Sequence, residues 1–398
     1  MNLKLTNILL FSLLLFFYGK ASAQLEGVTE FDTAKIASLV DQISLDSTQI
    51  VILGEEAHYD GIAMTINQKI ITELVQKYGF NTLLIESDFE SLLSIQKMIK
   101  KHHENDYNNE IKSIKGEEDH NLKSNIYKSW AHTKEFKNIL ELYHSDQLEI
   151  LGFDSKMHGL FVRKHFKNHY YHHLFFKDFK PNEKEEKVYH LVLKSLIENE
   201  FQDSTNINNQ KAFLNLITKA QSFYTDTLTH NYQTLKSIKN YAHQIWIEKE
   251  SPLKYMCMRD VNMVCNVDYL LKTELKNKKV IILGANLHVE PGIVKLIDNY
   301  VDYNIGDYLK KNYNTISIVP INYKGKRGSY QGVVKIQKPK KFMLASKLHK
   351  FNYHFALVDL NKIAPETLIY THDLVVPSVY GDYLIFIDKT KPSTFIPQ

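Results

Sequence analysis

The sequence of 398 residues contains only two cysteines, Cys257 and Cys265, and both fall in one predicted helix. At a rise of about 1.5 Å per residue, their Cα atoms lie about 12 Å apart. A disulfide needs Cα atoms within about 7 Å of each other. We therefore expect no intrachain disulfide and assign both side chains to helix packing.

The chain also has no strong excess of charge and, after its first residues, no long apolar run. Its formal net charge is +4, with lysine spread along the chain, so the composition predicts no nucleic-acid partner. No later run approaches the roughly 20 apolar residues that a spanning helix needs. We predict no stable membrane span.

Two common hydrolase signatures are missing as well. The sequence has neither the G-x-S-x-G turn of serine hydrolases nor the H-E-x-x-H helix of zinc peptidases. The usual serine-nucleophile and zincin sites therefore have no support in this chain.

The first residues have the order of a secretory signal peptide. Lys4 precedes an apolar run over residues 8–18, and Ala21-Ser22-Ala23 follow before Gln24. The run is too short to be a permanent membrane helix. We predict a signal peptide over residues 1–23 and a mature domain over 24–398 that is exported to the periplasm or secreted.

Four short apolar runs, over residues 50–53, 82–85, 148–153 and 280–283, each stop abruptly at polar residues. Such β-branched runs are typical of buried parallel strands. In open parallel sheets, ligands bind where strands end and loops turn back. The sequence therefore predicts one cleft ringed by ionisable side chains from all four ends, namely Glu55, His58, Glu86, Asp154 and His288.

The spacing of these runs predicts the fold. A helical pattern over residues 63–78 separates the first two runs and ends at Gly79, which suits a helix C-cap. Strand, helix and strand in about 35 residues form a βαβ unit with parallel strands. We expect a three-layer α/β/α fold with a mainly parallel sheet, extended by strands over 315–319, 354–360 and 383–387.

Residues from about 155 to 250 show helical patterns and no strand pattern. Because the sheet pattern resumes afterwards, we interpret this stretch as a helical insertion that covers the strand ends as a lid. Such a lid would set substrate selectivity.

The next helix begins at Ser251 and Pro252, which suit its N-cap and first position. It leads into the strand over 280–283, so its start lies at the carboxyl ends of the strands, which places Arg259 near the cleft. Further on, the glycines and basic residues over 325–328 lack the strand-to-helix setting of a phosphate loop and predict a hairpin or surface loop.

The predicted cleft contains histidines and carboxylates but no evident nucleophilic side chain. This combination suits direct attack by water, with a histidine as base and a carboxylate orienting its ring. Glu55 and Glu86 are candidates to orient His58, and His288 or Arg259 to stabilise the oxyanion. Two alternatives stay open: the same residues could bind a metal, and Glu55 or Asp154 alone could be a helix cap.

A series of short motifs runs through most of the mature chain. In order, they are Gly54-Glu55-x-x-His58, Tyr78-Gly79-Phe80, Ile85-Glu86-x-Asp88, Trp130, Leu151-Gly152-Phe153-Asp154, Arg259-Asp260-x-x-Met263-x-x-Asn266, Asn286-x-His288 and Gly306. In this combination and order the chain resembles the erythromycin esterase family.

The resemblance implies hydrolysis of a macrolide lactone ester without metal or cofactor. It implies that His58 is the general base and carries over Glu55, Glu86 and His288 as site residues. We add Arg259, Asp154 and Asn286 as supporting or substrate-binding residues. The partner would be a small-molecule ester or lactone.

The chain departs from the family pattern in two places. Ala285 stands where the family often has a histidine, and only Lys69 is a candidate for the basic residue of the first helix. The insertion shows no resemblance that can be aligned. The sequence therefore predicts a carboxylic ester hydrolase more firmly than it predicts a macrolide substrate. The alternatives are a metal-dependent hydrolase at the same cleft, or a protein of related fold that binds haem or another small ligand.

Overall fold

The computed structural model describes residues 25–104, 122–165, 179–198, 206–248, 250–296, 304–329, 332–369 and 377–396. The predicted signal peptide lies outside these ranges. Among the described helices, none is long and apolar enough to cross a membrane.

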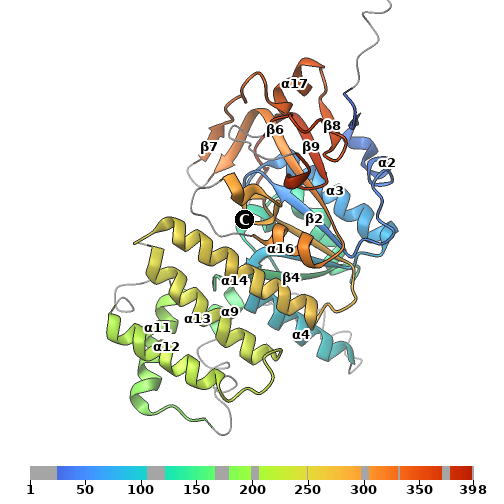
Figure 1. The fold of residues 1–398 in the computed structure, drawn as a ribbon. Helices are drawn as coiled ribbons and strands as arrows, with labels where there is room; N and C mark the ends of the chain where they lie inside the picture. Colours follow the sequence, from blue (N-terminus) through green and yellow to red (C-terminus); the bar gives the residue numbers. More distant parts are fainter. Residues whose placement is uncertain are drawn as a thin grey trace, which may run out of the picture.

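A nine-stranded sheet forms the centre of the fold, in the order β1-β8-β9-β6-β2-β5-β3-β4, with β7 paired to β6 (Figure 1). The strands are β1 (Val28–Glu30), β2 (Ile50–Glu55), β3 (Thr82–Asp88), β4 (Glu149–Asp154), β5 (Val280–Ala285), β6 (Thr315–Ser329), β7 (Gly332–Lys335), β8 (Phe355–Asp359) and β9 (Tyr383–Thr390). Every strand predicted from the sequence is present.

The sheet is mainly parallel, as predicted. Strands β4, β3, β5, β2, β6 and β9 run parallel to their neighbours in this core. Antiparallel pairing occurs only at β1–β8, β8–β9 and the β6–β7 hairpin among the described strands. The hairpin begins where the sequence predicted a hairpin or surface loop over 325–328.

Helices cover both faces of the sheet, which confirms the three-layer fold (Figure 1). Side chains alternate along a strand, so Val51 and Leu53 join the core beneath one helical layer while Ile50 and Ile52 join the other. The first layer contains α2 (Ile36–Val40), α3 (Gly61–Tyr78) and α8 (Lys137–His144), and the second contains α14 (Pro252–Lys272) and α16 (Ile305–Asn312). Helix α4 (Phe89–Glu104) contributes to both cores.

Local sequence explains where these helices begin and end. Asp60 caps the start of α3 by accepting from the Ala63 N–H, and Gly79 ends it at φ +73°, the left-handed conformation predicted there. Ser251 accepts from the Lys254 N–H at the start of α14, and Pro252 occupies the first turn.

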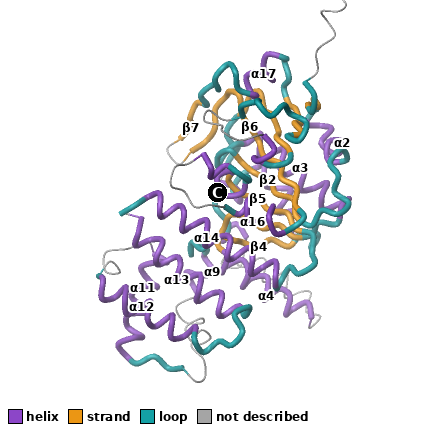
Figure 2. The backbone as a smooth tube through the Cα atoms, viewed as in Figure 1, coloured by secondary structure: helices purple, strands orange, loops and turns teal. Residues whose placement is uncertain are grey.

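The described part of the stretch from residue 155 to 250 contains helices and loops but no strand, and the helices are α9 (Leu160–His165), α11 (Glu183–Glu198), α12 (Ile207–Gln221) and α13 (His230–Glu248). These helices share a hydrophobic cluster separate from the sheet cores. Figure 2 shows them gathered beside the sheet, with α13 packed along α14. Whether this insertion closes over a substrate stays a prediction.

The remaining helices are short. They are η1 (Thr33–Lys35), α6 (Leu122–Asn125), α7 (Lys128–Ala131), η2 (Lys134–Phe136), α15 (Asn286–Val289), η4 (Ile293–Leu296), α17 (Leu344–Lys350) and η5 (Pro377–Tyr380). Two of them, α7 and α15, supply residues to the candidate site.

Candidate active site

Four adjacent strands, β2, β5, β3 and β4, bring the predicted site residues to one edge of the sheet. Glu55 ends β2, Asp154 ends β4, and Glu86 lies near the end of β3. The short helix α15, which carries His288, begins directly after β5. All four strands run parallel, so their carboxyl ends meet at this edge.

His58 and Glu55 form a contact pair at the end of β2. The chain turns sharply between β2 and α3, with Tyr59 at φ +70°, and His58 Nδ1 comes within 2.5 Å of Glu55 Oε1. Trp130, on α7, donates its indole N–H to both Glu55 oxygens at 3.1 Å. The carboxylate is thus fixed from two sides and in turn fixes the imidazole.

The outer nitrogen of His58 faces the second half of the site. His58 Nε2 lies 4.0 Å from Glu86 Oε1, too far for a direct hydrogen bond. The His58 side chain is 23% exposed, whereas the side chains of Glu55 and Glu86 are at most 1% exposed. His58 is therefore the member of this group that a solvent molecule or substrate can reach.

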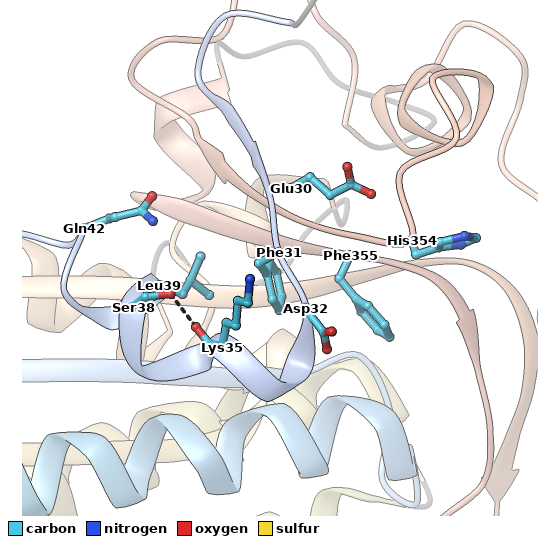
Figure 3. A pocket seen from close by; sticks show the side chains of 9 residues that line it. All are labelled: Glu30, Phe31, Asp32, Lys35, Ser38, Leu39, Gln42, His354 and Phe355. Carbon is cyan, nitrogen blue, oxygen red and sulfur yellow. Dashed lines mark hydrogen bonds between the residues drawn. The ribbon is translucent and has the colours of Figure 1, made fainter.

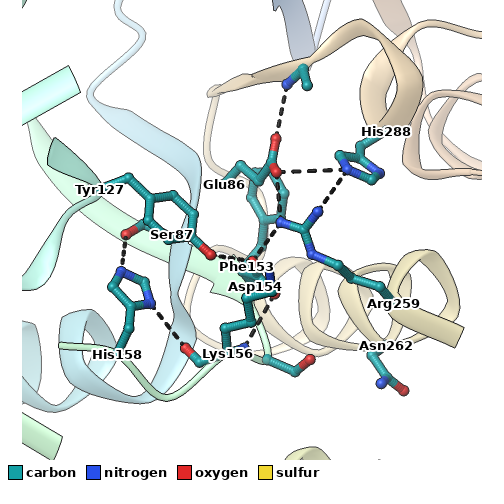
Figure 4. A network of polar contacts seen from close by, with 12 residues as sticks. Glu86, Ser87, Tyr127, Phe153, Asp154, Lys156, His158, Arg259, Asn262 and His288 are labelled. Atoms are coloured by element: carbon teal, nitrogen blue, oxygen red, sulfur yellow. Dashed lines mark hydrogen bonds and ion pairs between the residues drawn. The ribbon is translucent and has the colours of Figure 1, made fainter. Parts of the chain in front are cut away.

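Arg259 joins the ends of β3 and β4. Its Nη2 donates to Glu86 Oε1 and to Asp154 Oδ2, each at 2.6 Å, and its Nη1 lies 2.9 Å from His288 Nε2 (Figure 4). The guanidinium is almost fully buried. The placement of Arg259 near the cleft, expected from helix topology, agrees with this geometry.

His288 is held by contacts on both ring nitrogens. Its Nδ1 lies 2.5 Å from Asp260 Oδ1, and its Nε2 faces the Arg259 guanidinium, which only donates. The same Nε2 lies 3.6 Å from Glu86 Oε1, so both ring nitrogens of His288 face charged side chains. Because both ring nitrogens of His288 already have partners, Arg259, whose guanidinium stays positively charged, is the better candidate to stabilise an oxyanion.

The pKa values of His58 and Glu86, one in each half of the site, shift in opposite directions. Burial lowers the pKa of His58, but the Glu55 and Glu86 carboxylates outweigh it and raise that pKa to about 9. Burial would raise the pKa of Glu86, yet the His288, Arg259 and His58 side chains together lower it to about 2. Glu86 is therefore ionised at neutral pH, and the Glu55–His58 pair tends to retain a proton on the imidazole.

Asp154 is also held in its ionised form. Burial opposes its charge, but Arg259 and Lys156 hold the pKa of Asp154 well below its usual range. The Tyr127 hydroxyl donates to Asp154 Oδ2 at 2.7 Å, and the Tyr127 ring stacks on His158 with centroids 4.2 Å apart. Asp154 thus anchors Arg259 and is not a mere helix cap.

Three residues at the site were not assigned a role from the sequence. Trp130 and Asp260 appear in the family resemblance, and their contacts with Glu55 and His288 explain why they belong there. Tyr127 had no sequence signal, because its contact with Asp154 depends on the course of the chain between α6 and α7.

Asn286 and Lys69 lie apart from the ionisable network. The Asn286 amide donates to Pro320 O at 3.2 Å, and Lys69 donates to Thr33 O at 2.7 Å. At position 285, where the family often has a histidine, the alanine backbone N–H donates to Glu86 Oε2 at 2.9 Å. Position 285 therefore reaches the network through its backbone N–H, whereas Lys69 is bonded to Thr33 instead.

Glu56 points away from His58 and bonds the backbone and side chain of Asn322. With Asn286 and Leu287 it lines a cavity of about 600 Å³ on the β6 side of the site. A second cavity, of about 550 Å³, lies among β1, α2 and β8 (Figure 3) and contains none of the predicted site residues.

The residue chemistry at the site leaves little room for a metal. Across the described residues, no group of three or more histidine, cysteine, aspartate or glutamate side chains has an arrangement that could hold one. The reason is visible in Figure 4, where Arg259 occupies the position between Glu86, Asp154 and His288 that a cation would take.

Comparison with known proteins agrees with the predicted resemblance. The sequence profile of the family described as erythromycin esterase matches residues 75–372. The match includes Glu86, Asp154, Arg259 and His288 and begins after His58. A search of curated proteins finds no match.

Three solved structures share the fold. A mutant of the erythromycin esterase EreC in its open conformation is 12% identical, with a TM-score of 0.66 over 93% of this chain and 97% of that one. A succinoglycan biosynthesis protein is 16% identical, with a TM-score of 0.66 over 94% and 96%. A Bacillus cereus protein is 16% identical, with a TM-score of 0.64 over 92% and 100%. At these identities the likeness concerns the fold alone.

Proposed function

Because this chain belongs to the erythromycin esterase family, we propose that it is a carboxylic ester hydrolase that cleaves a lactone or ester with water activated by His58. The observation that carries the proposal is the Glu55–His58 pair, whose outer nitrogen faces the Glu86–Arg259 network. A macrolide is one candidate substrate class.

The reaction begins with a water molecule between His58 Nε2 and the bound ester. His58 Nε2 takes a proton as the water oxygen attacks the carbonyl carbon, and Glu55 stabilises the imidazolium through Nδ1. The proton then passes from His58 to the alkoxide oxygen as the carbon–oxygen bond breaks. A carboxylic acid and an alcohol result, which in a lactone remain parts of one opened ring.

Arg259 supplies the buried positive charge for the oxyanion that forms in this step. Glu86 and Asp154 hold its guanidinium in place before the reaction, so no reorganisation is needed when charge develops. His288, which Asp260 holds through Nδ1, contacts the same guanidinium from the other side.

The signal-peptide pattern of residues 1–23 supports action outside the cytoplasm, in the periplasm or beyond. Of the two alternatives, metal-dependent hydrolysis at this cleft conflicts with the position of Arg259. Ligand binding without turnover is separated from hydrolysis by the experiment below.

The test is a mass-spectrometric screen of macrolides, smaller lactones and linear esters for products that gain one water. We expect turnover of at least one class by the wild-type protein, unchanged by a chelator and lost in a folded His58→Ala variant. Ester hydrolysis by that variant at the wild-type rate would overturn the assignment of His58. Loss of activity with a chelator and its return with metal would favour the metal-dependent alternative. A spectral shift on adding haem, with no turnover of any ester, would favour a binding protein.

A further inference from the structure

The stretch over residues 324–350 contains nine Lys and Arg residues and no Asp or Glu. Its formal charge is therefore +9, against +4 for the whole chain, which leaves −5 for all other residues. The expectation that lysine is spread along the chain rather than clustered is wrong for this stretch. The imbalance is concentrated on the second half of β6, on β7, on the following loop and on α17, away from the helical insertion (Figure 1).

Most of this charge has no acidic partner. Lys324 pairs with Asp388 at 2.9 Å and Arg327 with Glu56 at 3.6 Å. For the other seven, no carboxylate of the described residues lies within ion-pair distance. We call these seven the basic surface: Lys326, Lys335, Lys338, Lys340, Lys341, Lys347 and Lys350.

The β6–β7 hairpin places two of these lysines against each other. Lys326 lies directly opposite Lys335 in the antiparallel register, and both are exposed. Opposed residues project to the same face, and like charges in such a pair destabilise the sheet. An anion that contacts both ammonium groups would remove this repulsion.

Large apolar side chains are exposed among these lysines. Val333 is 63% exposed, Phe342 50%, Val334 43% and Phe351 43%. Val333 and Val334 are consecutive in β7, so they project to opposite faces of the hairpin. Val333 lies two residues, about 6.6 Å, from Lys335 on the same face. Strand β7 thus presents one exposed aliphatic side chain on each face of the hairpin, with Val333 beside Lys335 and Val334 opposite Arg327.

Contacts around Tyr323 hold the parts of the surface together. The Tyr323 ring stacks on His349 of α17 with centroids 4.0 Å apart, and Lys338 lies 5.9 Å from the same ring. Strand β6, the loop after β7 and α17 therefore form one continuous region.

We propose that this region docks onto an anionic lipid bilayer. Val333 and Val334 would enter the interface between headgroups and acyl chains, while the lysines of the basic surface contact lipid phosphates. A nucleic acid offers matching charge, but it gives no reason for aliphatic side chains on both faces of a hairpin. A bilayer surrounds an inserted hairpin on both faces, and we therefore favour it.

The test is co-sedimentation of the full chain with vesicles of phosphatidylcholine alone and with added phosphatidylglycerol. We expect binding only to the anionic vesicles, weakened strongly between about 0.1 M and about 0.5 M salt. A lysine near an anionic bilayer strengthens partitioning by about fivefold, so Lys326→Gln, Lys335→Gln and Lys341→Gln together should weaken it about 100-fold. Val333→Ser with Val334→Ser should weaken it at constant charge.

The matched control replaces three exposed lysines elsewhere, with Lys184→Gln, Lys211→Gln and Lys276→Gln. This variant has the same net charge as the first and should bind almost as the wild type does. Equal loss in both triple variants would overturn the proposal, as would equal binding to neutral vesicles. Tighter binding to single-stranded nucleic acid than to anionic vesicles would also overturn it. Thermal unfolding shows that each variant is folded, and the proposal stands or falls independently of ester hydrolysis.

Discussion

At the scale of single residues, the proposed reaction depends on the contact between His58 and Glu55. A buried carboxylate 2.5 Å from the ring stabilises the imidazolium and raises the pKa of His58 to about 9. In the proposed reaction His58 accepts a proton, so its imidazole ring must first be neutral. Only about one molecule in a hundred has it at pH 7, so kcat/KM should rise with pH until about 9 and then level off.

The Glu55→Gln variant tests this coupling. Loss of the charge should move the rising limb of kcat/KM to lower pH by roughly 1–3 units. The plateau should fall by about 10²–10⁴-fold because the amide no longer stabilises the imidazolium. The measurement is the pH profile of kcat/KM on any ester found in the screen.

Glu56→Gln is the matched control for that variant. Glu56 is the next residue in the chain, but its carboxylate bonds Asn322 and contacts Arg327. In Glu56→Gln, the rising limb of the kcat/KM profile should stay near its wild-type pH. An equal shift in both variants would mean that the limb does not report on the Glu55–His58 pair.

At the scale of elements, Arg259 fastens α14 to the ends of β3 and β4. The guanidinium neutralises Glu86 and Asp154, whose carboxylates are fully buried. The same helix is attached a second time, since the Asn266 amide donates to Phe153 O at 3.1 Å. Arg259 therefore belongs to the candidate site and also stabilises the packing of α14 on the sheet.

Arg259→Met should destabilise the protein by about 3–5 kcal/mol at pH 7, because two buried carboxylates lose their cation. In the wild type, the lowered pKa values of Glu86 and Asp154 give stability that is present above their unfolded values, about 4. That stability is lost as the pH falls through the folded values, near 2 for Glu86. In the variant, protonation of Glu86 and Asp154 removes two unpaired buried charges and therefore stabilises the folded state.

The difference in unfolding free energy between the two proteins should therefore shrink from pH 7 to pH 4. Denaturant titrations at both values measure it. Arg163→Met, at an exposed position on α9, should cost less than about 0.5 kcal/mol. If the difference in unfolding free energy between the wild type and Arg259→Met does not change with pH, the buried ion pairs are not its cause.

At the scale of the whole molecule, the sequence predicted the sheet and the sheet edge at which the candidate residues lie. The polar residues after the apolar runs gave this result, since neighbouring parallel strands end together. Strand order was beyond the sequence, because the apolar runs of β2, β3 and β5 are nearly interchangeable. The antiparallel edge at β1 was missed because Val28–Glu30 is too short to show a pattern.

The partners of the site residues were harder to predict than the residues themselves. Trp130 reaches Glu55 across 75 positions of sequence, and Tyr127 reaches Asp154 across 27. Arg259 and Asp260 are consecutive on a helix, yet both contact His288 because the imidazole lies between them. Such contacts depend on tertiary packing and leave no periodic signal in the chain.

The most direct test of the central claim is chemical rescue of His58→Ala by imidazole. We predict that the variant is folded and inactive, and that added imidazole restores ester hydrolysis in proportion to its concentration. The rising limb of the pH profile of ester hydrolysis should move from about pH 9 to the pKa of the added imidazole. As a control, His349→Ala removes a histidine that contacts Asp388 at 2.6 Å outside the site, and it should stay active. A His58→Ala protein that hydrolyses the ester without imidazole, with the wild-type pH profile, would contradict the account.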